Sequence, residues 1–251
     1  MSEEVIKTIG LSIGYDGKEL MPSIDVTLHQ GELVAITGPN GSGKTTLFKT
    51  LTGTLRPVGG QTILLGRDLQ EYHPVERAKL ISIVLTEKPD DLFLSVFDIV
   101  AAGRAPYLGW LSKLQQQDRD IIEEKMQRVG ILHLQHRDFV SLSDGEKQKV
   151  MIAKALAQDT PIIFLDEPTA FLDYPSKVEL MQLLQRLAKE EHKTILFSSH
   201  DLDLLMKLSE QIWVMAPKKS LQAGTPQELL ERHVIEEYFG CDETTLNLLS
   251  K

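Results

Sequence analysis

The 251-residue sequence has a single cysteine, Cys241, so an internal disulfide bond is excluded. Without a disulfide, nothing in the composition points to an oxidising compartment. No run of apolar residues approaches the roughly 18 positions that a membrane-spanning helix needs. The first residues, 1–4, lack the basic flank and apolar core of a signal peptide. We therefore expect a cytoplasmic protein.

Basic residues are also in the minority. Lysine and arginine number 27 against 36 aspartates and glutamates, which gives a formal net charge of -9. No basic stripe stands out, and this argues against a nucleic-acid binder. An apolar content of 42% and a charged content of 25% are ordinary for a globular protein of one large or two small domains. A polyanionic ligand would therefore depend on a local positive field.

One motif supplies such a field. Residues 38–45 match the phosphate-binding pattern G-x-x-x-x-G-K-[ST] at every specified position, after an apolar run and before a helical segment. The glycines let successive backbone N–H groups point inward at phosphate oxygens, and the helix N-terminus adds partial positive charge. Lysine would reach the terminal phosphates and threonine would bind Mg²⁺. The residues are Gly38, Pro39, Asn40, Gly41, Ser42, Gly43, Lys44 and Thr45.

Short apolar runs alternate with helical segments along most of the chain, which predicts an α/β fold with a largely parallel sheet. Residues 5–30 predict strands with turns at 14–18 and around Pro22. Between 91 and 140 the residues have helical spacing, which the Gly- and Pro-containing segment 103–109 interrupts. Strands are predicted at 32–37, 61–65, 81–85, 161–166, 194–199 and 211–215, and helices at 44–51, 95–102, 115–129, 145–157, 176–191, from a capping box at Thr225, and at 233–239.

Acidic and histidine side chains follow two of these buried strands. Asp166 and Glu167 end the strand at 161–166, the position at which open parallel sheets place ligands. Asp166 suits Mg²⁺, and Glu167 could polarise a water for attack on a γ-phosphate. His200 follows the strand at 194–199 and could hydrogen-bond a γ-phosphate or the attacking water.

The segment 142–146 allows two interpretations. Ser143 and Glu146 have the S-x-x-E spacing of a capping box at the start of the next helix. The same helix N-terminus is also an anion site, so capping and phosphate contact are compatible. The residues alone leave both roles open.

The phosphate loop, 142–149, Leu165-Asp-Glu-Pro-Thr169, Leu172-Asp173 and His200 occur in an order that resembles ABC-type ATPase domains over nearly the whole chain. The resemblance implies a P-loop NTPase with a RecA-like α/β core, an antiparallel β subdomain and an inserted α-helical subdomain. In one ABC-type ATP-binding domain, 1–90 and 146–251 would form the core with the β subdomain, and 91–145 the helical subdomain.

The same resemblance implies ATP and Mg²⁺ as cofactors and a head-to-tail homodimer that encloses two ATP molecules. Ser143 and Gly145 of one subunit would contact the γ-phosphate held by the partner's Lys44. Tyr15 would stack on adenine, Thr46 would extend the phosphate-binding run, and Asp173 would face the opposite nucleotide across the dimer. Lys44, Glu167 and His200 would carry the catalysis.

Two departures from the family pattern stand out. Asp144 and Glu146 replace the usual glycine and glutamine. After the strand at 81–85 the chain has Thr86-Glu87-Lys88, where the family has a glutamine that can bond water and Mg²⁺. Thr86 offers one hydroxyl, so we expect the link from nucleotide to partner to run through Thr86, Glu87 or a bridging water.

Within the family, the segment 103–110 resembles importers of iron–siderophore, haem and cobalamin complexes. This implies an ATPase subunit that binds membrane permease subunits at the inner face of the cell membrane and works indirectly with a substrate-binding protein. An alternative is a soluble ABC ATPase such as an iron–sulfur assembly factor, which would share every nucleotide-site residue. A P-loop kinase is a third alternative, but nothing in the sequence resembles an acceptor site or a lid. The excess of acidic residues disfavours nucleic-acid partners.

Overall fold

The computed structural model describes residues 3–86, 93–109, 113–217 and 219–239. Contacts divide the chain into two compact units, one of residues 1–72 and 184–251 and one of residues 73–183. Glu87, Lys88, Trp110 and Cys241, about which the sequence raised expectations, lie outside the described residues. The boundaries expected at 90/91 and 145/146 stay a prediction.

An antiparallel sheet forms the N-terminal part of the first unit. Its strand order is β2-β1-β5-β6, with β3 paired to β1. The predicted turn around Pro22 is wrong, because Pro22 lies inside β2. That strand is at the edge of the sheet, where a residue without an N–H group is tolerated. The strands are β1 (Glu4–Tyr15), β2 (Lys18–Ile24), β3 (Thr27–His29), β5 (Gly59–Leu64) and β6 (Arg67–Asp68).

A second sheet in the first unit carries the phosphate loop. Strand β4 (Leu33–Thr37) pairs in parallel with β9 (Thr194–Ser198) on one side and with β10 (Gln211–Val214) on the other, and β11 (Gln222–Gly224) pairs antiparallel with β10. Every residue of β4 and β9 is buried, as expected for parallel strands that read as continuous apolar runs.

The helices of the first unit largely follow the expected positions. The capping box at Thr225 is confirmed at the start of α8, where the Thr225 hydroxyl accepts from the Glu228 N–H. The helix α7 was not predicted; its N-cap is Asp201. The helices are α1 (Lys44–Leu51), α7 (Leu202–Leu208), α8 (Pro226–Glu231) and α9 (Val234–Phe239).

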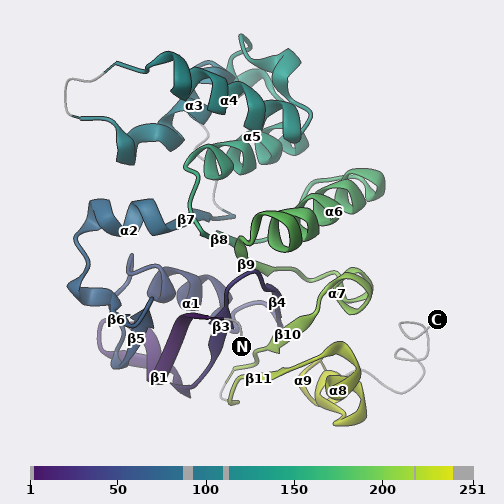
Figure 1. Cartoon of the computed structure of the whole chain (residues 1–251). Coiled ribbons are helices and arrows are strands. Elements are labelled where there is room, and N and C mark those ends of the chain that lie inside the picture. The colour runs from purple at the N-terminus through teal and green to yellow at the C-terminus, as the bar shows by residue number, and fades with distance from the viewer. Residues whose placement is uncertain (1–2, 87–92, 110–112, 218, 240–251) are drawn as a thin grey trace. The chain divides into compact units, whose positions relative to one another are not determined.

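The second unit combines two parallel strands with several helices (Figure 1). Strands β7 and β8 pair in register from Ile81 opposite Ile162 to Val84 opposite Leu165. Helix α6 contributes residues to both units. The elements are α2 (Pro74–Leu80), β7 (Ile81–Val84), α3 (Val96–Ala101), η2 (Ala102–Tyr107), α4 (Gln116–Arg128), η3 (Leu132–Leu134), η4 (Phe139–Ser141), α5 (Asp144–Ala157), β8 (Ile162–Leu165) and α6 (Tyr174–Glu191).

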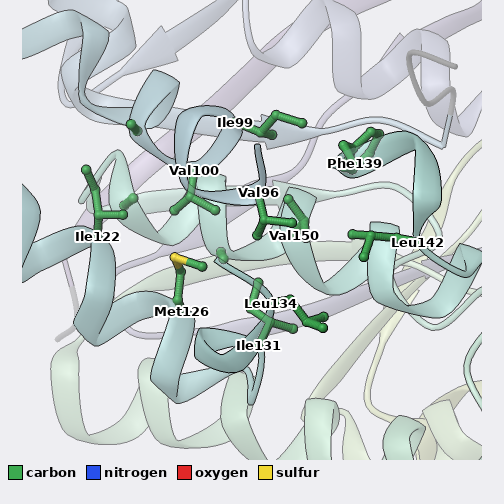
Figure 2. Close-up of a cluster of buried hydrophobic side chains, with 13 residues drawn as sticks. Val96, Ile99, Val100, Ile122, Met126, Ile131, Leu134, Phe139, Leu142 and Val150 are labelled. Atoms are coloured by element: carbon green, nitrogen blue, oxygen red, sulfur yellow. The ribbon is translucent and has the colours of Figure 1, made fainter. Parts of the chain in front are cut away.

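Figure 2 shows the apolar cluster that packs α3, α4 and α5 of the second unit together. Side chains from α3, α4 and α5 meet in it, with Phe139 of η4 fully buried beside them. The apolar residues recur at helical spacing, so each helix turns one apolar face into the cluster. Its labelled members are Val96, Ile99, Val100, Ile122, Met126, Ile131, Leu134, Phe139, Leu142 and Val150.

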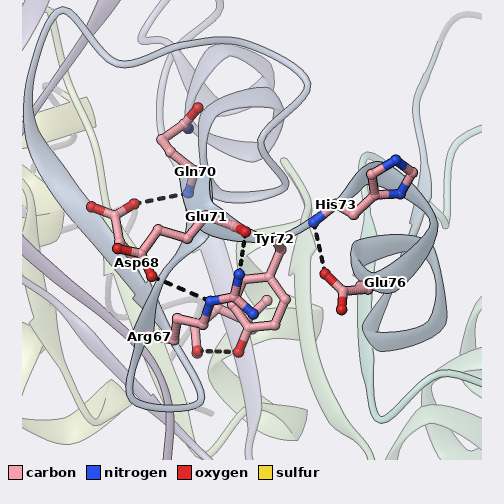
Figure 3. Close-up of polar contacts among 8 residues, drawn as sticks. Arg67, Asp68, Gln70, Glu71, Tyr72, His73 and Glu76 are labelled. Atoms are coloured by element: carbon pink, nitrogen blue, oxygen red, sulfur yellow. Dashed lines mark hydrogen bonds and ion pairs between the residues drawn. The ribbon is translucent and has the colours of Figure 1, made fainter.

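Helix α2 was not predicted, and its start explains why (Figure 3). His73 is the N-cap: its Nδ1 accepts from the Val75 N–H at 3.4 Å, while Glu76 Oε2 accepts from the His73 N–H at 2.8 Å. Histidine is not among the usual capping residues, so the signals of Pro74 at the first helical position and of Glu76 were not recognised as a helix start. In the first unit, Asp68 caps the short helix η1 (Leu69–Glu71) by accepting from the Gln70 N–H at 2.8 Å.

The segment 103–109, expected to interrupt the helical spacing, is for the most part the 3-10 helix η2. A Cβ on Gly103 would lie 2.3 Å from the Lys154 carbonyl oxygen, so glycine is needed for η2 to approach α5. Arg104 is 7% exposed, and its Nε donates to Asp118 Oδ1 at 3.0 Å. Much of this segment is therefore held by packing.

Across the described residues, no helix combines the length and hydrophobicity that crossing a membrane requires.

Candidate functional site

The phosphate loop connects β4 to α1 in the first unit and depends on three glycines. A Cβ on Gly38 (φ 152°) would lie 2.0 Å from the Met215 carbonyl oxygen, and one on Gly43 (φ 100°) would lie 2.8 Å from Leu20 Cδ2. Gly41 has open space but a φ of 77°, a conformation that L side chains rarely adopt. A larger residue would therefore clash with backbone at Gly38 and would be strained at Gly41 and Gly43.

Two carbonyl groups of the loop bind the lysine side chain. Lys44 is 7% exposed, and its Nζ donates to the carbonyl oxygens of Gly38 at 2.9 Å and Pro39 at 3.3 Å. The Ser42 hydroxyl is buried and has no hydrogen-bond partner among the described residues. Asn40 is exposed and Thr45 is half-buried. Buried hydroxyls normally find partners, so this group is available to a ligand.

Tyr15 and Thr46 lie together although 31 positions separate them. The Thr46 hydroxyl donates to Tyr15 Oη at 3.2 Å. Thr46 is in the first turn of α1 and 6% exposed, while Tyr15 is the last residue of β1 and 47% exposed. An aromatic ring with its hydroxyl anchored next to the phosphate loop suits contact with a base.

His200 leaves the same edge of the sheet as the phosphate loop. Ile36 of β4 pairs with Ser198 of β9, and the Ser199 N–H donates to the Ile36 carbonyl at 3.1 Å. Gly38 lies two residues after Ile36, and His200 lies two residues after Ser198. His200 is exposed. The first unit therefore brings the phosphate loop and His200 to the carboxyl ends of adjacent parallel strands, where such sheets bind ligands.

In the second unit, Asp166 and Thr86 occupy the equivalent ends of β8 and β7. The Asp166 N–H donates to the Val84 carbonyl at 2.8 Å, and the Thr86 hydroxyl donates to the Asp166 carbonyl at 3.4 Å. Asp166 is 1% exposed. Thr86 thus contacts the Asp166 backbone, while the Asp166 carboxylate is an oxygen donor of the kind that Mg²⁺ prefers.

Glu167 has a left-handed backbone, with φ 52°. Its carbonyl accepts from the Ala170 N–H at 3.0 Å, which closes the turn after β8. Phe171, four residues on, also has a positive φ of 65° and is 62% exposed. Such conformations in non-glycine residues cost free energy. Glu167 itself is half-buried, and its Oε1 atom is buried.

The capping box at the start of α5 is confirmed. Glu146 Oε2 accepts from both the N–H of Ser143, at 2.8 Å, and its hydroxyl, at 2.9 Å, while the Glu146 N–H donates to Ser143 Oγ at 3.3 Å. The bonds from Ser143, the N–H first, hold the pKa of Glu146 below its usual value, and Arg137 and His133 add to this. Ser143 remains exposed.

Gly145 brings the start of α5 against the turn that follows Glu167. A Cβ on Gly145 would lie 3.2 Å from the Phe171 carbonyl oxygen and 3.6 Å from Leu172 Cδ2. Asp173 follows, and Asp173 Oδ1 accepts from the Ser176 N–H at 3.0 Å. Bonds from Ser176, the side chain first, lower the pKa of Asp173, as does the charge of Lys149. The second unit thus gathers Ser143, Gly145 and Asp173 in one neighbourhood.

The expected residues form two groups. The first unit holds the phosphate loop with Tyr15, Thr46 and His200; the second holds Thr86, Asp166 and Glu167, with Ser143, Gly145 and Asp173 nearby. Among the described residues, no three or more His, Cys, Asp or Glu side chains are arranged to hold a metal ion.

A buried polar cluster in the second unit was not predicted from the sequence. Arg104 pairs with Asp118, donates to the Ala157 carbonyl at 2.9 Å and stacks 4.3 Å from the Tyr107 ring centroid. Burial, and then the charge of Asp159, raise the pKa of Tyr107 above 10.0. No local pattern in the sequence marks Arg104 and Asp118 as partners, because they lie 14 positions apart. The cluster fixes η2 against α4 and α5.

Comparison with known proteins adds to this geometry. A family model described as ABC transporter matches residues 21–170. The ABC transporter ATP-binding protein MJ0873 of Methanocaldococcus jannaschii is 37% identical, over 94% of this chain and 81% of its own length. The iron(3+)-hydroxamate import ATP-binding protein FhuC of Bacillus subtilis is 31% identical over 94% and 88%. A solved structure described as a metal-chelate type ABC transporter has a TM-score of 0.82, at 25% identity, over 94% of this chain and 89% of that one.

Proposed function

Because the chain belongs to the ABC transporter family, as an ATP-binding cassette with ATPase activity, we propose that it is the ATP-hydrolysing subunit of an iron-chelate importer. The observation that carries the ATPase part is the glycine-dependent loop that surrounds Lys44. The importer part is supported by FhuC, named for iron(3+)-hydroxamate import, and by the structure described as metal-chelate type. Siderophore, haem and cobalamin complexes are the candidate cargoes.

ATP binding is assigned to the first unit. The backbone N–H groups of the loop and the N-terminus of α1 would hold the phosphates, and Lys44 Nζ would exchange its two carbonyl partners for phosphate oxygens. The buried Ser42 hydroxyl, which has no partner within the described part of the chain, would donate to the same group. Tyr15, exposed and anchored through Thr46, would stack on adenine.

Mg²⁺ fits the residues available, since hydroxyl and carboxylate oxygens are its preferred protein donors. Thr45 and Asp166 would hold it, and Thr86 is the further candidate from the sequence. When bound, the ion would neutralise charge on the phosphates. The Thr86 bond to the Asp166 carbonyl supports an additional part for Thr86 in positioning the Asp166 backbone.

Hydrolysis is an in-line attack by water on the γ-phosphorus. Glu167 would accept a proton from the water as the new P–O bond forms, and the bond to the β-phosphate oxygen breaks to release ADP and phosphate. His200 would hydrogen-bond the γ-phosphate or the water, and Lys44 would stabilise the negative charge that develops. The buried Oε1 atom of Glu167 supports a positioned rather than a solvated carboxylate.

A head-to-tail homodimer would complete the site. Ser143 and Gly145 of one subunit would meet the γ-phosphate bound by its partner, and Asp173 would face the same nucleotide. The support is that these three residues already share one exposed neighbourhood beside Phe171. ATP would close the dimer, and closure would move permease subunits in the membrane, at whose inner face this subunit would be attached. A substrate-binding protein would deliver the cargo.

The catalytic part is tested with Glu167→Gln, which keeps the shape of the side chain and removes its basicity. We expect ATP hydrolysis to fall by about 10²–10⁴-fold, while the variant runs as an ATP-dependent dimer on a sizing column. Glu190→Gln, an exposed position on α6, is the matched control and should behave as wild type. Near-normal hydrolysis by a monomeric Glu167→Gln variant would remove Glu167 from this role.

The transport part is tested by affinity purification of the chain from detergent-solubilised membranes. We expect permease subunits to be recovered with it, and uptake of ferric hydroxamate to fail in a strain that lacks the gene. Complementation with the Glu167→Gln variant should not restore uptake. Washed membranes without the protein, together with normal uptake, would support the alternative of a soluble ABC ATPase such as an iron–sulfur assembly factor.

A further inference from the structure

The contact between Thr46 and Tyr15 joins the antiparallel sheet to the phosphate loop. Thr46 directly follows the lysine and threonine of the loop motif, and its hydroxyl donates to Tyr15 Oη at 3.2 Å. Thr46 is 6% exposed, whereas Tyr15 is 47% exposed. One end of the exposed ring is therefore fixed to a nearly buried point of α1.

The backbone of Tyr15 is fixed separately. Tyr15 pairs with Lys18 across the β1–β2 hairpin, and a Cβ on Gly14 would lie 1.9 Å from the Lys18 carbonyl oxygen. The hairpin also rests on the loop, because a Cβ on Gly43 would lie 2.8 Å from Leu20 Cδ2. With its backbone held in this way, the ring of Tyr15 keeps only its side-chain torsions, and the bond to Thr46 restrains those.

Restraint of an exposed ring has a consequence for binding. A side chain that must be ordered when a ligand arrives costs affinity, and holding it in place beforehand removes part of that cost. An aromatic face stacks on any base and anchors it. A hydroxyl that fixes the ring should therefore strengthen the binding of the nucleobase without taking part in phosphate chemistry.

We propose that Thr46 is a positioning residue: through its bond to Tyr15 Oη, it holds the Tyr15 ring beside the phosphate loop for stacking on the base of the nucleotide. This rests on the proposed function, in which the loop binds ATP and Tyr15 meets adenine. It assigns to the Thr46 side chain a task distinct from phosphate binding. The two tasks predict different responses to a ligand that has phosphates but no base.

The experiment compares Tyr15→Phe, Thr46→Val and the double variant in steady-state ATP hydrolysis. Tyr15→Phe keeps the ring and removes only the hydroxyl; Thr46→Val keeps the shape of the buried side chain. Inorganic tripolyphosphate, as a competitive inhibitor, reports on the phosphate site alone. Thr52→Val is the matched control, because Thr52 is another buried threonine, at the far end of α1, whose hydroxyl bonds the Phe48 carbonyl at 2.9 Å.

We expect each single variant to raise the KM for ATP by about 2- to 10-fold, with kcat within about twofold of wild type. The double variant should be no worse than either single variant, because the two changes remove one shared bond. Inhibition by tripolyphosphate should be unchanged in all three. Thr52→Val should leave the KM for ATP unchanged.

Three results would overturn the inference. Additive increases in KM in the double variant would show that the two hydroxyls act separately. A matching loss of tripolyphosphate inhibition in Thr46→Val would show that Thr46 binds phosphate directly. An unchanged KM in Tyr15→Phe, a variant that disturbs no buried volume, would show that the ring needs no anchor. Failure of the wild-type protein to hydrolyse ATP would instead overturn the proposed function.

Discussion

The buried ion pair between Arg104 and Asp118 makes the sharpest stability prediction. The pair is 3.0 Å long, and the side chains are 9% and 12% exposed. Asp118 Oδ2 also accepts from the Gln115 N–H at 3.1 Å at the start of α4. Asp118→Asn would keep the size and one carbonyl oxygen but remove the charge, leaving Arg104 buried beside a neutral group.

The magnitude follows from what is lost. A charge-assisted hydrogen bond contributes about 1.5–3 kcal/mol, and a negative charge in the first turn of a helix about 0.5 kcal/mol more. Arg104 keeps its bond to the Ala157 carbonyl and its stacking on Tyr107, so the cost should be below the full value for breaking a buried pair. We expect a loss of about 3 kcal/mol in the free energy of unfolding.

The assay is urea unfolding followed by circular dichroism. With a slope of about 2–3 kcal/mol/M, the midpoint should fall by about 1–1.5 M. Glu124→Gln, on the same helix and with the same change of charge, is the control; its pairs with Lys125 and Arg128 are more exposed and should cost about 0.5 kcal/mol or less. Equal midpoints for Asp118→Asn and Glu124→Gln would refute the reasoning.

The pH dependence of the free energy of unfolding tests whether the charge of Asp118 causes this loss. The Gln115 N–H, and with it Arg104, lowers the pKa of Asp118 from 3.8, although burial acts in the opposite direction. A lowered pKa in the folded state means that the stabilisation is complete above the ordinary value and is lost as the pH falls through the folded one. The gap between wild type and Asp118→Asn should stay constant from neutral pH to about pH 5 and narrow below 3.8.

Further predictions concern the phosphate loop and the helix that starts at Ser143. Gly38→Ala should abolish ATP binding in equilibrium dialysis and destabilise the fold, because its Cβ would lie 2.0 Å from the Met215 carbonyl oxygen; retained binding would contradict this. Gly41→Ala, with open space around it, should cost only about 1 kcal/mol in thermal unfolding. Ser143→Ala should remove the cap of α5 and cost about 1 kcal/mol. Because the pKa of Glu146 is lowered, this cost should shrink as acidification protonates Glu146, and a cost independent of pH would count against the capping box.

The sequence predicted best where backbone geometry leaves little choice. The loop at 38–45 needs glycine conformations that few sequences satisfy by accident. Strands β8 and β9 end at 165 and 198, each within one residue of the end predicted from a continuous apolar run. Helix α2 was not predicted because its N-cap is His73 rather than a usual capping residue, although Pro74 and Glu76 mark its first turn. Pro22 suggested a turn, but an edge strand accepts proline.

Long-range polar contacts could not be predicted from local pattern. Arg104 and Asp118 lie 14 positions apart in segments of different structure, and their pairing depends on how η2 packs against α4 and α5. The bond between Thr46 and Tyr15 spans 31 positions and depends on the seating of a hairpin. Periodicity reports which side of an element is buried, but not which polar group it meets there.

The most direct test of the central claim is calorimetric titration of the protein with MgATP, comparing wild type, Lys44→Ala and Lys49→Ala. Lys49 is on the same helix and half-buried, so it controls for loss of a lysine. A charge pair at about 4 Å is worth about 4 kcal/mol at an effective dielectric near 20, so Lys44→Ala should lower the affinity about a thousandfold. Equal affinities for all three proteins would contradict the assignment of the phosphate loop as the nucleotide site.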